Sequence, residues 1–286
     1  CSSDLDRELT SSYHLHASPT LYPGQIVRAR VEADDDNLRP VCVRLYASRY
    51  RADDQTEHAC GAAMEIPPGA ARDLEWTVAG SGGQPIHAIG LELSGGDTGA
   101  VFLDTLTWDG APSVVFTRPD RAGSMWQRAW VSGVDQFRGT WPEAFRPVQN
   151  EGRGLLIQGA QEWHGYRVAA EIKPLMMAAG GLAVCVQGLR RYYALLLAPG
   201  GKLRLIKVYD QESVLSEIDF DWAFDRTYGL ALETHANHLR AYLGDRLVFA
   251  VEDRTLPLTS GAIALVVEDG CLATQAVAVQ VADEAS

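Results

Sequence analysis

The residues best suited to hold a ligand lie between positions 163 and 193. Sugars present flat faces of C–H groups, for which an exposed Trp or Tyr ring offers an apolar platform, while neighbouring polar groups fix the hydroxyls. An arginine pair in an acidic chain can also hold a carboxylate or a phosphate through two parallel hydrogen bonds. The predicted ligand-binding residues are Trp163, Gln187, Arg190, Arg191, Tyr192 and Tyr193.

Strand alternation limits how many of these side chains can serve together. The stretch 187–193 joins two strand patterns through a short turn. On a strand, Arg191 and Tyr193 share one face while Arg190 and Tyr192 share the other. One pair is therefore expected to look outward into a groove, and the other ring is expected to be core. The alternative is that this whole strand packs in the interior.

Asp104 is the candidate metal ligand. It follows the apolar residues Val101 and Leu103 on a strand pattern. Hard cations take several oxygen ligands, so Asp104 together with carbonyl oxygens near the chain start could hold a structural Ca²⁺. An ion pair with an arginine is the alternative, and no other cofactor is expected. His14 and His16 would share a strand face, but the sequence offers no third or fourth metal ligand beside them.

The motifs of common enzymes are missing. There is no G-x-S-x-G turn, and the glycines at 80–83 form a turn pattern rather than a nucleophile site. Gly152 and Gly154 lack the third glycine of a dinucleotide-binding loop. Glycosidases need two carboxylates at a set separation, and the acidic run 217–221 leads into a strand end instead. We therefore predict a chain that is not an enzyme.

The overall charge and composition exclude several classes of partner. The net charge of −12 argues against nucleic acid and against an anionic membrane surface, since either needs a dense cationic face. No run of about 18 apolar residues exists, so no membrane span is expected. At 286 residues the chain is long enough for about two domains.

The cysteines suggest a reducing compartment. They number five, an odd count, and no C-x-x-C pair occurs. Reduced thiols in a cytoplasmic protein are the favoured interpretation, with a Cys42–Cys60 disulfide left open. Cys1 also suits the lipidated first residue of a bacterial lipoprotein, and we keep this as the alternative to a chain excised from a longer one.

The elements that must position these residues are β-strands. In 26–33 and 41–48 apolar and polar residues alternate, and the same period of two recurs in 166–173. Clusters rich in Gly, Pro and Asp separate these runs, and Gly244-Asp245 predicts a tight hairpin turn. Regular short strands with turn signals between them predict an all-β protein of two antiparallel sandwich (jelly-roll) domains in tandem.

The predicted domain boundary lies near Pro112, which gives domains 1–112 and 113–286. Residues 113–150 form a connector with the first strands of the second domain, and prolines and glycines there disfavour a helix. Its three tryptophans are predicted to pack between the domains. They are Trp126, Trp130 and Trp141.

Short motifs in both halves resemble known sandwich families. The second half, with Trp163-His164-Gly165-Tyr166, Arg191-Tyr192-Tyr193-Ala194-Leu195 and Ser260-Gly261-Ala262-Ile263, resembles concanavalin A-like (laminin G-type) sandwiches. The first half, which ends in the strand 101–108, resembles galactose-binding-type jelly rolls, in which a late strand often carries an aspartate like Asp104. The resemblance implies a concanavalin A-like second domain, with ligands at a concave face or at loop tips.

The combination of both halves also resembles the accessory region that follows the catalytic domain in some bacterial ADP-ribosylglycohydrolase-family proteins. This resemblance implies a non-catalytic binding region, with a carbohydrate or glycan-like ligand, attached to a hydrolase domain outside these residues. The alternative hypothesis is a structural or interaction module that clamps a catalytic domain or an oligomer, and a glycosidase is a third, weaker one.

Overall fold

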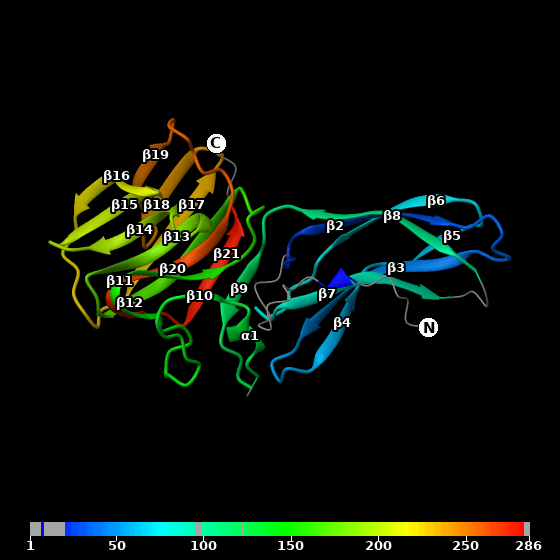
Figure 1. The fold of residues 1–286 in the computed structure, drawn as a ribbon, viewed down its shortest axis with the longest axis horizontal. Helices are drawn as coiled ribbons and strands as arrows, with labels where there is room; N and C mark the ends of the chain where they lie inside the picture. The colour runs from blue at the N-terminus through cyan, green and yellow to red at the C-terminus, as the bar shows by residue number, and fades with distance from the viewer. Residues whose placement is uncertain (1–6, 9–20, 95–98, 122, 283–286) are drawn as a thin grey trace.

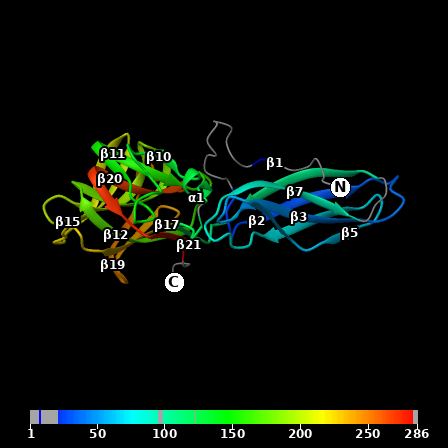
Figure 2. The same ribbon diagram turned by 90° about the horizontal axis from the view of Figure 1, so that it is seen from below.

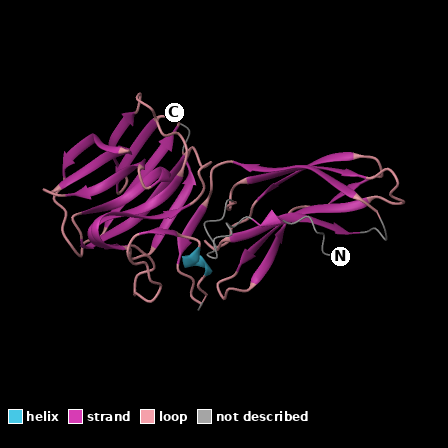
Figure 3. Cartoon of the chain, viewed as in Figure 1, coloured by secondary structure: helices cyan, strands magenta, loops and turns pink. Residues whose placement is uncertain are grey.

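The chain forms two β-sandwiches joined end to end (Figure 1). The computed structural model describes residues 7–8, 21–94, 99–121 and 123–282. Every strand pairing within these residues is antiparallel. Strands dominate the described residues, and the short helix α1 (Met125–Arg128) is drawn in cyan in Figure 3. The predicted fold class, all-β with two antiparallel sandwiches in tandem, is confirmed.

The first sandwich packs a sheet of five strands on a sheet of three. Alternation decides which side chains enter the core, because Val27, Ala29 and Val31 face the opposite sheet while Arg28 and Arg30 face solvent. The strands of the larger sheet are β1 (Arg7–Glu8), β7 (Ile86–Ser94), β3 (Val41–Tyr50), β4 (Thr56–Cys60) and β5 (Met64–Ile66), and those of the smaller are β6 (Ala71–Thr77), β2 (Ile26–Ala33) and β8 (Val101–Asp109).

The second sandwich contains the other 13 strands in two layers. The six-stranded sheet runs in the order β9 (Val114–Thr117), β21 (Ala276–Val281), β12 (Tyr166–Met176), β17 (Tyr228–His235), β18 (His238–Leu243) and β19 (Arg246–Glu252). The seven-stranded sheet runs β10 (Val131–Gly133), β11 (Val148–Gln158), β20 (Ala262–Ala273), β13 (Ala179–Gly188), β14 (Arg191–Ala198), β15 (Lys202–Tyr209) and β16 (Gln211–Asp219). The end of β12 also pairs with β20, so the two layers are joined at one corner.

The seven-stranded sheet is strongly curled. Arg153 of β11 forms ion pairs with Glu268 of the adjacent β20 and, at 2.5 Å, with Glu212 of β16. Four strands lie between β11 and β16, which a flat sheet would hold about 24 Å apart at the usual strand spacing. The curl brings these edges together, and it encloses a second apolar cluster on the sheet's outer face that includes Leu196 and Ile206.

The connector differs from its prediction in two respects. Residues 125–128 form α1, and Trp126 and Trp130 pack inside the second sandwich rather than between the domains. Both indole rings contact Phe145, at centroid distances of 5.7 and 4.9 Å. Trp141 lies under the guanidinium of Arg146 instead. The prediction that these rings join the domains is therefore wrong, because the second core takes two of them.

The Cys42–Cys60 disulfide that the sequence left open is absent, and both thiols are free. The register places Cys60 opposite Tyr46, four residues along β3 from Cys42, which corresponds to about 13 Å. A disulfide needs Cα atoms within about 7 Å, so the strand geometry forbids the bond.

The two sandwiches meet beside α1, which Figure 2 shows at the junction between them. The carboxylate of Asp54, in the β3–β4 turn, accepts hydrogen bonds from the backbone N–H groups of Ser124 and Met125 at 2.8 to 3.0 Å. Tyr22, which precedes β2 of the first sandwich, also contacts the second. Its hydroxyl donates to the amide oxygen of Gln158 on β11 at 2.7 Å. Around the predicted division at Pro112, β8 ends at Asp109 and β9 begins at Val114; the division itself stays a prediction.

Asp54→Ala is expected to lower the free energy of unfolding by about 1 kcal/mol, because it leaves the first N–H groups of α1 without an acceptor. Burial would raise the pKa of Asp54, but the N–H groups of Met125 and Ser124 stabilise the carboxylate and bring the pKa below its usual value. The contribution is thus present above the pKa of an unfolded Asp and is lost as the pH falls through the lower folded value. Urea unfolding of both proteins at neutral and acidic pH measures it, with the exposed Asp120→Ala as control. Equal losses of unfolding free energy in the two variants would refute a stabilising role of Asp54 at the start of α1.

Candidate functional site

The aromatic residues predicted to bind a ligand are buried. Trp163, Tyr192 and Tyr193 are 0%, 2% and 1% exposed. The expectation that one of the two tyrosines looks outward is wrong, because both faces of the curled seven-stranded sheet carry apolar clusters: Tyr193 lies in the cluster between the layers and Tyr192 in the outer one. None of these three rings offers a face to a ligand.

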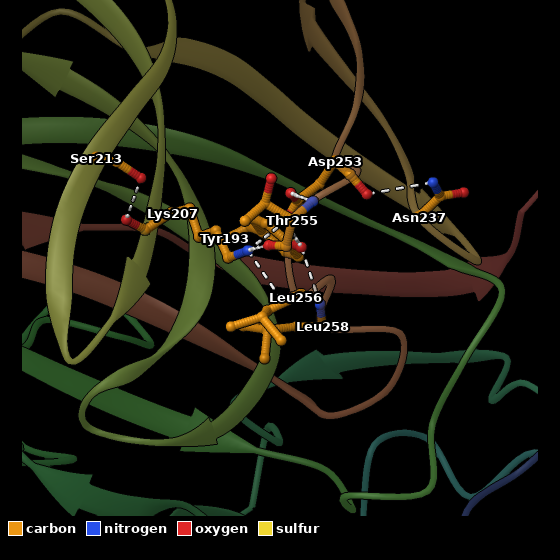
Figure 4. Close-up of polar contacts among 8 residues, drawn as sticks. All are labelled: Tyr193, Lys207, Ser213, Asn237, Asp253, Thr255, Leu256 and Leu258. Atoms are coloured by element: carbon orange, nitrogen blue, oxygen red, sulfur yellow. Dashed lines mark hydrogen bonds and ion pairs between the residues drawn. The ribbon is translucent and has the colours of Figure 1, made fainter.

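Tyr193 belongs to a buried polar network that ties the two sheets together (Figure 4). Its hydroxyl donates to Asp253 at 2.5 Å and accepts from the N–H of Leu258 at 2.9 Å. Lys207 pairs with the same carboxylate and also donates to the carbonyls of Thr255 and Leu256. Burial raises the pKa of Tyr193, and the hydrogen bond to Asp253 raises it further. The network holds the segment after β19 against β14 and β15.

Tyr192 and Trp163 have structural contacts of other kinds. The hydroxyl of Tyr192 lies 3.5 Å from Arg153, whose ion pairs close the outer face of the sheet. Burial alone would lower the pKa of Arg153, but its hydrogen bonds with Tyr192 and Glu212 raise it above the usual value. Trp163 packs edge-on against Tyr22 at 4.6 Å.

The three polar candidates remain at the β13–β14 turn. Gln187 donates to the carbonyl of Ser260 at 3.0 Å, and Arg190 lies 3.5 Å from Asp210. Arg191 lies over the ring of Tyr209. The structure thus brings Gln187, Arg190 and Arg191 to one end of the sandwich, without the exposed ring that was expected beside them; their role in ligand binding stays a prediction.

Asp104 lies on β8 and is exposed. The carbonyl oxygens near the chain start that were expected to complete a Ca²⁺ site, like His14 and His16, lie outside the described residues. Within the described residues, the one set of three or more acidic, His or Cys side chains close enough together to share a metal ion is Asp34, Asp35 and Asp36, in the β2–β3 turn. The structural Ca²⁺ at Asp104 stays a prediction.

A groove of about 610 Å³ lies on the outer face of the six-stranded sheet of the second sandwich. Alternation along β12 turns Val168 and Ala170 into the core and Ala169 and Glu171 outward. Cross-strand pairing then places Ala278, Ala169 and Ala231 side by side. With Ala276 and Gly229 they form a floor that carries no side chain larger than a methyl group.

Charged and polar side chains surround this floor. Arg167 and Lys173, outward on β12 beyond either end of it, are held by neighbours: the Arg167 guanidinium lies 4.5 Å from the centroid of Tyr242, and Lys173 pairs with Asp225 at 3.2 Å. Glu171 has no ion-pair partner within the described residues, and a side chain at Gly229 would meet its carboxylate. The remaining polar wall residues are Glu143, Thr227, Asp245 and Gln275.

The alternation of 166–173 predicts that Arg167, Ala169 and Glu171 share one face, but no ligand site was predicted there because this face carries no aromatic ring. The usable signal was a small residue at an outward position in each of three strand patterns, namely Ala169, Ala231 and Ala278. Which strands lie side by side could not be obtained from local pattern, and this adjacency is what assembles the groove.

No protein-family model and no curated protein matches this chain. Among solved structures it is similar to a carbohydrate-binding module from Bacillus subtilis, with 19% identity and a TM-score of 0.48 over 53% of this chain and 94% of the module. It is also similar to a Bacillus subtilis protein of unknown function with a galectin-like fold (14% identity, TM-score 0.44, 56% of this chain and 92% of that one). A Caenorhabditis elegans galectin matches at 10% identity and a TM-score of 0.34, over 41% of this chain and 83% of the galectin.

The resemblance to the accessory region of ADP-ribosylglycohydrolase-family proteins stays a prediction. In the described part of the chain, no helix has the length and apolar character needed to cross a membrane.

Tyr193→Phe is expected to lower the free energy of unfolding by about 1–3 kcal/mol, because it removes a donor to Asp253 and leaves the buried N–H of Leu258 without an acceptor. Tyr192→Phe is the matched control on the same strand, and it removes only a long contact with Arg153. Urea unfolding measures both variants. A loss for Tyr192→Phe equal to that for Tyr193→Phe would contradict the structural role of the network.

Proposed function

We propose that this chain is a non-catalytic binding module that takes a carbohydrate in the groove of the six-stranded sheet. The observation that carries the proposal is the combination of a flat alanine and glycine floor with charged and polar walls. The C–H face of a sugar ring can lie on alanine methyl groups, as it does on an aromatic ring, with its hydroxyls directed to the walls.

The wall residues supply both partners that a hydroxyl needs. Arg167, Lys173 and Gln275 provide N–H donors, while Glu171 and Asp245 provide carboxylate acceptors. Hydrogen bonds to ionised groups are about twice as strong as those between neutral groups. They can therefore replace the hydrogen bonds to water that a sugar loses when it binds. The unpaired Glu171 disfavours acidic sugars by repulsion, so neutral sugars fit the groove better than uronic or sulfated ones.

The module would act alongside a catalytic partner. An attached hydrolase domain outside these residues is part of the proposal, and it rests on the sequence resemblance. The isolated chain is expected to bind polysaccharide without cleaving it. Affinity gel electrophoresis measures the binding, and a reducing-end assay on the same samples measures any cleavage. Release of sugar that is abolished by Glu171→Gln would overturn the non-catalytic assignment.

Ala169→Tyr is expected to weaken carbohydrate binding at least about tenfold, equivalent to about 1.4 kcal/mol, because the new ring occupies the middle of the floor. Tyrosine favours strands, so the thermal midpoint should change little. Binding is measured by affinity gel electrophoresis against neutral glucans, galactans, mannans, xylans, fructans and chitin.

Val214→Tyr is the matched control, since Val214 is half exposed on β16 in the other sheet. It should bind as the parent chain does. Equal binding by Ala169→Tyr and the parent would exclude the groove, and failure of the parent to bind any glycan of this panel or of a glycan array would refute the proposed function.

A further inference from the structure

A second hollow lies on the same sheet face. It measures about 360 Å³ and is bordered by side chains of β17, β18 and β19. His235 and His238 face each other directly across the β17–β18 pairing, and Glu252 of β19 lies opposite His238. Both histidines are exposed. We call this hollow the histidine cavity.

Strand register places the groove and the histidine cavity on adjoining rows of side chains. Ala169 and Ala231 form the groove row, and Arg167, Glu233 and Arg240 form the next row along the strands. His235 and His238 form the row after that. All of these residues alternate with core residues such as Leu232 and Leu239, so all of them point away from the sandwich interior.

We propose that the groove and the histidine cavity are two parts of one binding surface, and that its ligand is therefore a neutral oligosaccharide chain rather than a single sugar. The inference rests on the proposed function and extends it. From Gly229 in the groove to His235 in the cavity is six residues of β17, or about 20 Å at the usual rise per residue. That length exceeds one sugar ring and suits a chain lying along the strands.

The row between the two hollows permits such a crossing. Glu233 is buried and pairs with Arg240 at 3.3 Å, while Arg167 is held over Tyr242. These contacts keep the long side chains low against the sheet and balance Glu233 with Arg240. A neutral chain can thus pass over the row while it accepts hydrogen bonds from the guanidinium groups.

Small residues keep the far end open. Ala250 of β19 continues the row of Arg240 and is exposed, and Gly165 before β12 lies beside His235 without a side chain to cover it. The imidazole rings of His235 and His238 therefore border an accessible space. Each ring offers an apolar edge and two nitrogens to a sugar.

The test is a length series with a variant in each part. The probes are neutral oligosaccharides of one to six residues from glucose, galactose, mannose, xylose, fructose and N-acetylglucosamine, and isothermal titration calorimetry measures Kd. For the parent chain, affinity should rise by about tenfold or more between the shortest and the longest member that bind. Ala250→Tyr should remove that gain and leave the affinity for the shortest member unchanged.

Three further variants are compared with the parent chain. Ala169→Tyr should weaken short and long members alike, and Val214→Tyr should change neither. If Ala250→Tyr unfolds early in a thermal melt, His238→Ala replaces it with the same expectation. Affinity that is flat with chain length, or a long-chain affinity unchanged in both cavity variants, would overturn the extended surface while leaving the groove intact. No binding of any member, or of the parent polysaccharides, would instead remove the proposed function itself.

Discussion

The curl of the seven-stranded sheet is the constraint on which the second sandwich depends. One face of this sheet packs against the six-stranded sheet, and the other encloses Leu196, Ile206 and Tyr192 behind the Arg153 ion pairs. A sheet that is buried on both faces stabilises the domain but leaves no surface for a ligand. The proposed carbohydrate groove lies instead on the six-stranded sheet, where an alanine and glycine floor is surrounded by charged and polar side chains.

A buried ion pair supports this arrangement from the side. Lys207 and Asp253 are 8% and 6% exposed, and neither charge would be tolerated there without the other and the surrounding carbonyl groups. Burial would raise the pKa of Asp253, but Lys207 and Tyr193 lower it below its usual value. The pair fixes the segment after β19 of one sheet to β15 of the other.

Local pattern in the sequence was sufficient for the strands but not for the curl. The period of two predicted the strands β2 and β12, together with the outward face that carries Arg167 and Glu171. The turn predicted at Gly244-Asp245 is confirmed between β18 and β19. The same rule predicted that either Tyr192 or Tyr193 must be exposed, because alternation alone assumes that a sheet has one wet face. Burial of the second ring depends on β11 approaching β16, a contact between residues far apart in the chain that no local signal encodes.

The groove could be predicted only in part for a related reason. The small outward residues of a single strand do not make a floor, because a groove forms only when β21, β12 and β17 lie side by side. β21 begins more than a hundred residues after β12 begins. The short helix α1 was missed because its stability comes from outside itself. Its first N–H groups are satisfied by Asp54 from the other sandwich, and Trp126 anchors it in the core.

Tyr22 shows that the first sandwich contributes a residue to the core of the second. It precedes β2 of the first sandwich, yet its ring is part of the core of the second, where it touches Trp163 and Phe116 and binds Gln158. A second sandwich cut at residue 113 would lose the ring that packs on Trp163 and the hydroxyl that donates to Gln158, whose amide oxygen would keep only the N–H of Gly159 as a donor. The two sandwiches are therefore not interchangeable units, because the core of the second is complete only when the segment before β2 of the first supplies Tyr22.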